Sequence, residues 1–346
     1  MIIPLTGTTS AKISAELLRA RRSAGGAAQG MVLTLIIVCD ESEYESAMET
    51  SMAAGREHPS RILLVVTAAG RSAGLDAEVH IGEGTPGDVV VIRMRGAVAA
   101  HPASVIRPLL LPDSPVVIWW PGKAPNNQAA DELAQLSMRR LTDAAASARP
   151  LATLRARARD YTPGDTDLSW TRLTPWRALL AAALDQYPAK IKSVLIEAEN
   201  GNPSADLLAA WLQLRLKVDA TRKISSGPGL TAVRMATAAG DIAITRPDGL
   251  LAHYAVPGQP ERLVALKRRD STELISEELR RMDADDVYER AIKSLLDSAQ
   301  RVGSTRSAAR KAASKKTASK TMGKKSSGRK KADSRDRVAE QPAGRR

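Results

Sequence analysis

The sequence predicts an α/β N-terminal domain with a mainly parallel sheet, an α+β C-terminal domain with an antiparallel meander, and a disordered basic tail. In the first half, continuous apolar runs alternate with segments of helical periodicity, which is typical of a sheet covered by helices. After residue 230, short strand-like runs are joined by turn signals. Because 346 residues exceed the usual size of one core, we expect domains at 1–150 and 151–302 and a tail at 303–346.

The first domain is expected to alternate helices and buried strands. Continuous apolar runs at 31–38, 61–67 and 115–120 predict strands covered on both faces, because a half-exposed strand would alternate in polarity. Runs at 78–81 and 89–94 predict a strand pair around a Gly-rich turn. Apolar residues at helical spacing predict helices at 8–22, 41–54, 97–106 and 128–141.

The second domain is expected to pack helices on an antiparallel sheet. The pattern predicts helices at 175–184 and 203–217, and strands at 193–198, 231–236, 241–245, 250–256 and 262–266. Pro247-Asp248-Gly249 is a strong turn signal between two of these strands. An apolar stripe from Val287 to Val302 predicts a helix that closes the fold.

The positive charge of the protein is concentrated in the tail. The formal net charge is +13, and residues 301–346 hold 16 Lys and Arg against three acids, which leaves 35 basic and 35 acidic residues in 1–300. Lys, Ala, Ser and Thr dominate the tail, so it has too little apolar surface to offset the entropy of ordering. The body is formally neutral, and the charge does not argue for its main function.

The cysteine count and the apolar runs indicate a cytoplasmic protein. Cys39 is the only cysteine, so no intramolecular disulfide can form, and a reducing compartment fits. The first ten residues lack the pattern of a signal peptide. No apolar run approaches the length of a membrane span, so no membrane association is expected.

The sequence predicts no catalytic, metal or cofactor site. The four histidines stand apart from one another and from any nucleophile signature. Residues 82–87 match G-x-G-x-x-G, but the following DVVVIRM predicts a strand where a dinucleotide site needs a helix. A hairpin turn is therefore the favoured interpretation.

Two helix starts suit either a structural cap or an anion. Thr174-Pro175 and Asn202-Pro203 each place a capping residue before a proline, and Arg172 and Arg177 flank the first. Free amides at helix starts attract anions, so a sugar phosphate could bind there. Because every capped helix has such amides, the structural interpretation is favoured.

Five tryptophans lie in the middle of a chain that has no phenylalanine. Trp119 and Trp120 are adjacent on a predicted strand, so their side chains point to opposite faces and cannot share one core. One of them covers the second face of the sheet or is exposed at an interface, where Trp is enriched. Trp176 is in register with Leu179 and Leu180, which favours the core.

The tryptophan-bearing segments resemble a known family. LLLPDSPVVIWWPGKAP (109–125), SWTRLTPWRALLAAALD (169–185) and NPSADLLAAWL (202–212), with REHPSRILLV (56–65) and MVLTLIIV (31–38), are similar to the glucose-6-phosphate dehydrogenase assembly protein family, also called OpcA. The resemblance covers about 1–300 and leaves out the tail. It implies a non-catalytic partner of glucose-6-phosphate dehydrogenase that supports its active oligomer or its response to substrate, and hence NADPH supply in the oxidative pentose phosphate pathway.

The partner interface is expected where the sheet strand with the two tryptophans ends. Open α/β sheets commonly bind at this edge. The candidate interface residues are Trp119, Trp120, Pro121, Gly122, Trp170, Arg172 and Arg177, with core packing as the alternative for each Trp. Two other functions stay open: weak, nonspecific nucleic-acid binding through the tail, and sugar-phosphate binding at the helix starts.

Overall fold

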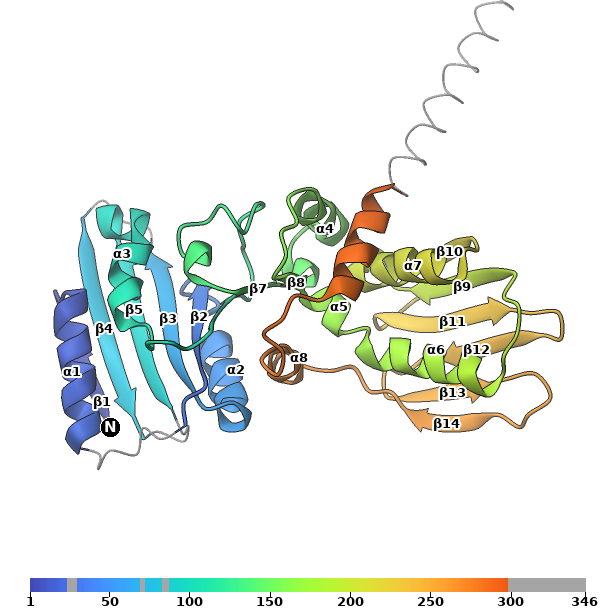
Figure 1. The fold of residues 1–346 in the computed structure, drawn as a ribbon, viewed down its shortest axis with the longest axis horizontal. Helices are drawn as coiled ribbons and strands as arrows, with labels where there is room; N and C mark the ends of the chain where they lie inside the picture. Colours follow the sequence, from blue (N-terminus) through green and yellow to red (C-terminus); the bar gives the residue numbers. More distant parts are fainter. Residues whose placement is uncertain (24–29, 69–71, 83–86, 298–346) are drawn as a thin grey trace, which may run out of the picture. The chain divides into compact units, whose positions relative to one another are not determined.

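Two sheets organise the computed structural model, which describes residues 1–23, 30–68, 72–82 and 87–297 (Figure 1). The first sheet has eight strands in the order β1-β4-β5-β3-β2-β6-β7-β8. Their bounds are β1 Ile2–Leu5, β2 Leu33–Cys39, β3 Ser60–Ala68, β4 Gly74–Ile81, β5 Asp88–Arg95, β6 Val116–Trp120, β7 Arg139–Thr142 and β8 Asp165–Asp167. Residues Met1–Leu296 form one compact unit.

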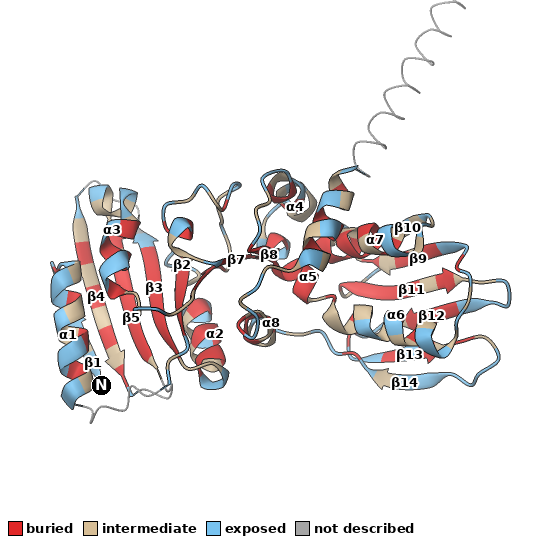
Figure 2. Ribbon diagram, in the orientation of Figure 1, coloured by how far each residue is buried: buried red, intermediate tan, exposed pale blue. Residues whose placement is uncertain are grey.

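The first sheet is mainly parallel, as the sequence predicts. β5, β3, β2, β6, β7 and β8 pair in parallel, whereas β1 and β4 extend the edge beyond β5 in antiparallel pairs. The central strands are buried on both faces, which explains their continuous apolar sequences (Figure 2). β8 extends this sheet to Asp167, beyond residue 150, and the division of the chain into domains stays a prediction.

Helices cover both faces of the first sheet. Four elements cover one face and enclose one apolar cluster. They are α1 (Ser10–Ser23), α3 (Pro102–Ile106) and the 3-10 turns η1 (Gly96–Ala100) and η2 (Arg107–Leu109). On the other face α2 (Tyr44–Glu57) and α8 (Ser271–Glu278) enclose a second. α8 comes from far along the chain, and Leu274 and Ile275 are fully buried there.

The second sheet has six strands in the order β10-β9-β11-β12-β13-β14. Their bounds are β9 Ser193–Ala198, β10 Ala220–Ile224, β11 Leu230–Ala236, β12 Asp241–Thr245, β13 Leu251–Ala255 and β14 Arg262–Ala265. β11 to β14 form the predicted antiparallel meander, and β9 pairs in parallel with β10. The sheet is therefore mixed, and its parallel pair was not predicted.

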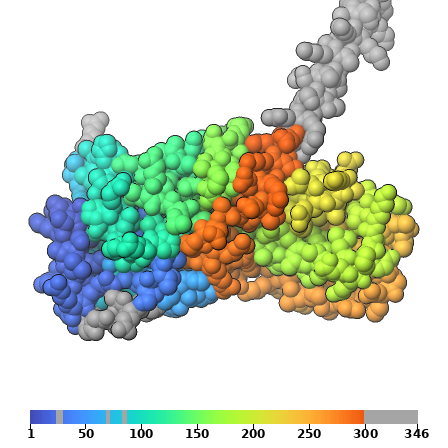
Figure 3. Space-filling view, viewed as in Figure 1, coloured from blue at the N-terminus to red at the C-terminus, as the bar shows by residue number. Residues whose placement is uncertain are grey.

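Four helices follow β7 along the chain and precede β10: α4 (Pro150–Arg159), α5 (Leu168–Thr171), α6 (Thr174–Gln186) and α7 (Pro203–Leu216). With a helix over 286–297, they help enclose the third apolar cluster. Tyr288, Ala291, Ile292 and Leu295 are buried, which confirms the predicted closing helix as far as residue 297. Figure 3 shows this part of the chain, in orange, along one surface.

The predicted helix over 128–141 is wrong. The chain forms a 3-10 turn, η3 (Ala134–Leu136), and then the strand β7. The Asp131 carboxylate accepts hydrogen bonds from the Leu133 and Ala134 amides at 3.0 and 3.1 Å, which favours a tight turn over a continuous helix. β7 then satisfies its backbone by pairing with β6 and β8, so tertiary pairing overrides the local helical periodicity.

Two further predictions concern residues that lie partly or wholly outside the described ranges. The Gly-rich turn between β4 and β5 lies partly outside them, but Gly87 is followed directly by β5. The predicted tail, 303–346, lies wholly outside them. Within these ranges no helix is long and apolar enough to cross a membrane.

Candidate functional site

The two adjacent tryptophans of β6 are core residues. Trp119 and Trp120 are each 2% exposed. Trp120 belongs to the cluster under α1 and α3, and Trp119 to the cluster under α2 and α8. Their opposite orientations follow from strand geometry, so burial on both faces is the outcome and neither indole lies on the surface.

The predicted interface segments start at the same edge of the first sheet. β6, β7 and β8 are parallel neighbours, so Pro121-Gly122 after β6 and the segment after Asp167 both begin at the carboxyl edge. Pro121 and Gly122 are partly exposed, and Lys123 is exposed. A Cβ on Gly122 would lie 1.5 Å from Glu43 Oε1, so this turn approaches the Glu43 side chain closely.

Asp167 fixes the segment that carries Trp170 and Arg172. Its carboxylate is 1% exposed and forms an ion pair with Arg157 at 2.8 Å. It also accepts hydrogen bonds from the Thr142 hydroxyl and from the Ala144 and Ser169 amides, between 2.9 and 3.2 Å. The bond from Ser169 caps α5. One buried carboxylate thus ties the end of β8 to α4 and to the loop after β7.

Trp170 is also a core residue. Its indole is 1% exposed, and its Nε1 donates a hydrogen bond to Asp285 at 2.9 Å. The Arg177 guanidinium lies 3.8 Å from the Trp170 ring centroid, a cation–π contact that covers the indole. Burial lowers the pKa of Arg177, although Asp285 and Glu277 oppose this effect. Arg177 is half-buried, so it is the more accessible member of the pair.

Arg172 is held by an acidic partner. Its two terminal nitrogens donate to the two Asp143 oxygens at 2.8 and 2.6 Å. Burial lowers the pKa of Arg172, but the hydrogen bonds and charge of Asp143 outweigh it, and the net pKa is raised. This bidentate pair fixes Arg172 beside the start of α6.

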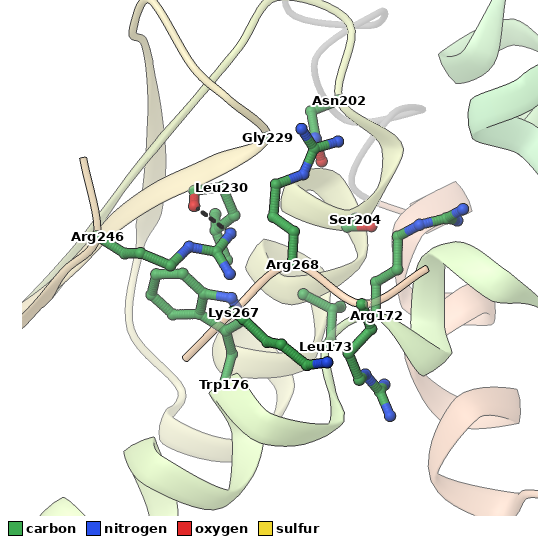
Figure 4. Close-up of a pocket in the computed structure, with 11 residues that line it drawn as sticks. Arg172, Leu173, Trp176, Asn202, Ser204, Gly229, Leu230, Arg246, Lys267 and Arg268 are labelled. Carbon is green, nitrogen blue, oxygen red and sulfur yellow. Dashed lines mark hydrogen bonds between the residues drawn. The ribbon is translucent and has the colours of Figure 1, made fainter. Parts of the chain in front are cut away.

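A cationic pocket lies where both predicted helix starts meet. It has a volume of about 470 Å³ including the part open to solvent. Five of its eleven lining residues are Arg or Lys, and none is acidic, so its wall is strongly positive. The lining residues are Arg172, Leu173, Trp176, Asn202, Ser204, Gly229, Leu230, Arg246, Lys267, Arg268 and Arg269 (Figure 4).

Arg246 forms the inner wall of this cationic pocket. It is 4% exposed and donates hydrogen bonds to the carbonyl oxygens of Leu266 and Leu230 at 2.7 and 2.9 Å. Its guanidinium lies 5.0 Å from the Trp176 ring centroid. Burial and the positive charge of Arg268 lower the pKa of Arg246 to about 10. The surroundings of Arg246 therefore disfavour its charged form.

A second cavity, of about 570 Å³ with its open part, has walls of both signs. Arg139, Arg177 and Arg281 line it together with Glu277, Glu278, Asp283 and Asp285. Arg139 is paired with Glu278 at 2.5 Å. Burial raises the pKa of Glu278, although Arg139 opposes this effect. Its mixed charge gives this cavity no clear preference for a ligand of either sign.

Sequence reasoning located part of the cationic pocket. It identified the starts of α6 and α7 and Arg172, but not Arg246 or the run Lys267-Arg268-Arg269. Three consecutive cations directly after a strand were the available signal. Their convergence with Arg246 depends on the meander, which the sequence pattern does not place relative to the helices.

The remaining chemical candidates have structural roles in the described ranges. Cys39 is 3% exposed, and burial with nearby Glu43 and Asp40 raises the pKa of its thiol to about 12. The strand after Gly87 gives residues 82–87 no helix start for a dinucleotide. No group of three or more His, Cys, Asp or Glu within the described residues is arranged to hold a metal ion.

Two family models match the sequence in order. Residues 51–159 match the model described as the glucose-6-phosphate dehydrogenase subunit N-terminal domain. Residues 163–292 match the corresponding C-terminal domain. Together the matches include parts of both sheets and all residues that line the cationic pocket. No functionally curated protein matches the chain.

Three solved structures have a distant likeness to this chain. An oxidoreductase domain protein from Kribbella flavida has 11% identity and a TM-score of 0.44 over 79% of this chain and 98% of its own. An oxidoreductase from Sinorhizobium meliloti has 11% identity and a TM-score of 0.38 over 79% and 89%. A dehydrogenase from Clostridium difficile has 7% identity and a TM-score of 0.39 over 77% and 99%. At these scores the likeness carries no argument about activity.

Proposed function

Because this chain belongs to the glucose-6-phosphate dehydrogenase subunit family, we propose that it is a non-catalytic assembly factor and allosteric effector of glucose-6-phosphate dehydrogenase. The observation that carries the proposal is the ordered match of both family domains across residues 51–159 and 163–292. In this role the protein supports NADPH supply through the oxidative pentose phosphate pathway, in the cytoplasm.

The proposed effect needs no chemistry on this chain. A protein that binds one state of an oligomer more tightly than another shifts the population by the difference in binding free energy. Typical couplings of about 1–3 kcal/mol change an affinity by roughly 5- to 150-fold. Binding to the active oligomer alone therefore accounts for activation.

We place the interface at the carboxyl edge of the first sheet. Pro121 and Gly122 would contact the partner directly, with the exposed Lys123 beside them. Trp119 and Trp120 are buried, so they would act by fixing the strand beneath the turn.

The segment after β8 would extend this interface. Arg172 and Arg177 would contribute their partly exposed guanidinium groups, and Trp170 would support Arg177 from below. Both segments follow parallel strands of one sheet, which is the geometric support for a single surface.

The test is a kinetic titration of glucose-6-phosphate dehydrogenase from the same cell with the full chain. We expect a saturable change in kcat/KM, and no turnover of glucose 6-phosphate by the chain alone. Dehydrogenase kinetics that stay constant up to a large molar excess of the chain would refute the effector role. Turnover by the chain alone would refute the non-catalytic assignment.

A further inference from the structure

We propose that the cationic pocket between α6, α7 and the meander binds the phosphoryl group of a small anionic metabolite. This proposal is independent of the partner assignment, because it rests on the pocket alone. Each of the two helix starts has an ordinary structural explanation when taken alone, but together they form part of one site. Three observations support this proposal: the positive charge is only partly balanced, a hydroxyl on the pocket wall has no described partner, and both helix starts lie at the same pocket.

The positive charge of the pocket is only partly balanced. Arg172, Lys267 and Arg269 pair with Asp143, Glu273 and Glu277. In contrast, within the described ranges Arg246 and Arg268 form no ion pair with a carboxylate. Arg268 is exposed, but Arg246 is buried, and a buried cation without a counter-ion is costly. An anion in the pocket would supply the missing negative charge.

Ser204 provides the second observation. It is 5% exposed and lines the pocket. Its hydroxyl is accessible and has no hydrogen-bond partner among the residues that the structure describes, whereas the Arg246 Nε on the same wall is buried and unpaired. Ser204 lines the same pocket as Arg268 and Arg172 (Figure 4). An oxygen-rich anion would accept a hydrogen bond from this hydroxyl and from the guanidinium groups.

Both helix starts contribute to the same pocket. Leu173 precedes α6 and Asn202 caps α7, and both residues line the wall. These helices have 13 and 14 residues, so each directs the positive end of a full dipole toward the site. Asn202 itself accepts a hydrogen bond from Ala205 at 3.0 Å, so its side chain caps the helix.

The turns of the second sheet leave room for Arg268. Gly249 has φ +78, and a Cβ there would lie 3.3 Å from Arg268 Cδ. The Arg268 amide donates to the Gly249 carbonyl at 2.8 Å, which anchors its backbone. The Arg268 side chain is exposed and extends toward Asn202 (Figure 4). The predicted Pro247-Asp248-Gly249 turn therefore has a second role in shaping the pocket.

Guanidinium groups favour phosphoryl oxygens because their N–H groups match them in pairs. The pocket volume of about 470 Å³, which includes space open to solvent, suits a small ligand. Arg246 is only 4% exposed, which favours a small ligand over a large acidic surface.

The test is isothermal titration calorimetry of the full chain with inorganic phosphate, glucose 6-phosphate and glucose at constant ionic strength. We expect saturable 1:1 binding of the two phosphates and no heat from glucose. Tighter binding of glucose 6-phosphate would identify a sugar phosphate as the ligand class, whereas equal affinities would identify phosphate itself. No saturable heat from either phosphate would overturn the proposal.

Two variants locate the binding site. Arg268→Gln removes an unpaired cation, and Ser204→Ala removes a hydroxyl that has no partner in the described part of the chain, so neither breaks a described side-chain contact. We expect about tenfold or greater loss of phosphate affinity for Arg268→Gln and a several-fold loss for Ser204→Ala. Arg262→Gln, an exposed arginine on nearby β14, is the matched control and should keep the wild-type affinity.

The variants also separate this pocket from the basic residues after 297. Phosphate bound there would be insensitive to Arg268→Gln and Ser204→Ala, and equal affinities for all four proteins would overturn the proposal. Phosphate should also raise the melting temperature of the wild type, because a ligand that binds the folded state stabilises it. This rise should be smaller for Arg268→Gln than for Arg262→Gln.

Discussion

Replacing Asp167 with Asn tests whether one carboxylate holds together the carboxyl edge of the first sheet. Both oxygens of Asp167 accept hydrogen bonds: one from Ser169, one from Arg157 and Thr142, with Ala144 near both. An Asn side chain has only one oxygen. Whichever way it turns, its NH₂ group faces at least one N–H donor, and the two donors repel.

The expected loss is large because a buried charge is left unpaired. Arg157 and Asp167 are 6% and 1% exposed, and removing one partner of such a pair costs about 3–5 kcal/mol. Asp167→Asn should therefore lower the free energy of unfolding by about 3 kcal/mol or more. With a denaturant dependence of roughly 3 kcal/mol per M, the urea midpoint would fall by about 1 M.

The assay is equilibrium urea unfolding followed by the fluorescence of the five tryptophans, which include the nearby Trp170. Asp160→Asn is the control, because Asp160 is exposed at the end of α4 and should change stability by less than about 0.5 kcal/mol. A loss below about 1 kcal/mol for Asp167→Asn would refute the reasoning. An equal loss for both variants would show that the buried network is not the cause.

Three further predictions concern Cys39, the β6 tryptophans and the exposed turn. With its pKa raised to about 12, Cys39 should react with a thiol reagent at about pH 8 at least three orders of magnitude more slowly than in urea; a native rate close to the unfolded one would contradict its burial. Trp120→Ala should lower the free energy of unfolding in urea by about 3–5 kcal/mol. Trp119→Phe should leave the effect of the chain on the dehydrogenase unchanged. Loss of that effect at unchanged stability would indicate that the Trp119 indole contacts the dehydrogenase directly. Lys123→Glu should weaken the effect on the dehydrogenase several-fold without changing stability, and the equally exposed Lys192→Glu should not; equal results for the pair would argue against the proposed interface.

Strong, local patterns predicted most of the fold. β9 and β12 occur at their predicted bounds, and the ends of β2, β3 and β6 shift by at most two residues. These strands are either continuous apolar runs or lie between clear turns. β1, β8 and β10 are short, and β8 and β10 are also polar. They depend on pairing with neighbouring strands, so the local sequence did not predict them. The same dependence explains β7, which has a helical pattern but is held as a strand by β6 and β8.

The sequence predicted only those parts of the cationic pocket that a local motif marks. The predicted cap Asn202 is confirmed at the start of α7, but the predicted cap Thr174 is the first residue of α6, and the start of α6 has no side-chain cap. Arg246 and Arg268 are ordinary surface residues by sequence, and only the path of the meander brings them to those helix starts. For the tryptophans, the sequence showed that Trp119 and Trp120 must face apart, but not that α8 returns to bury one of them.

The most direct test of the central claim is the molar mass of purified glucose-6-phosphate dehydrogenase, measured by light scattering with and without the full chain. We predict that the two proteins elute together at a defined stoichiometry and that the chain shifts the dehydrogenase toward its active oligomer. Separate elution, with an unchanged molar mass of the dehydrogenase, would contradict the assignment of this chain as its assembly factor.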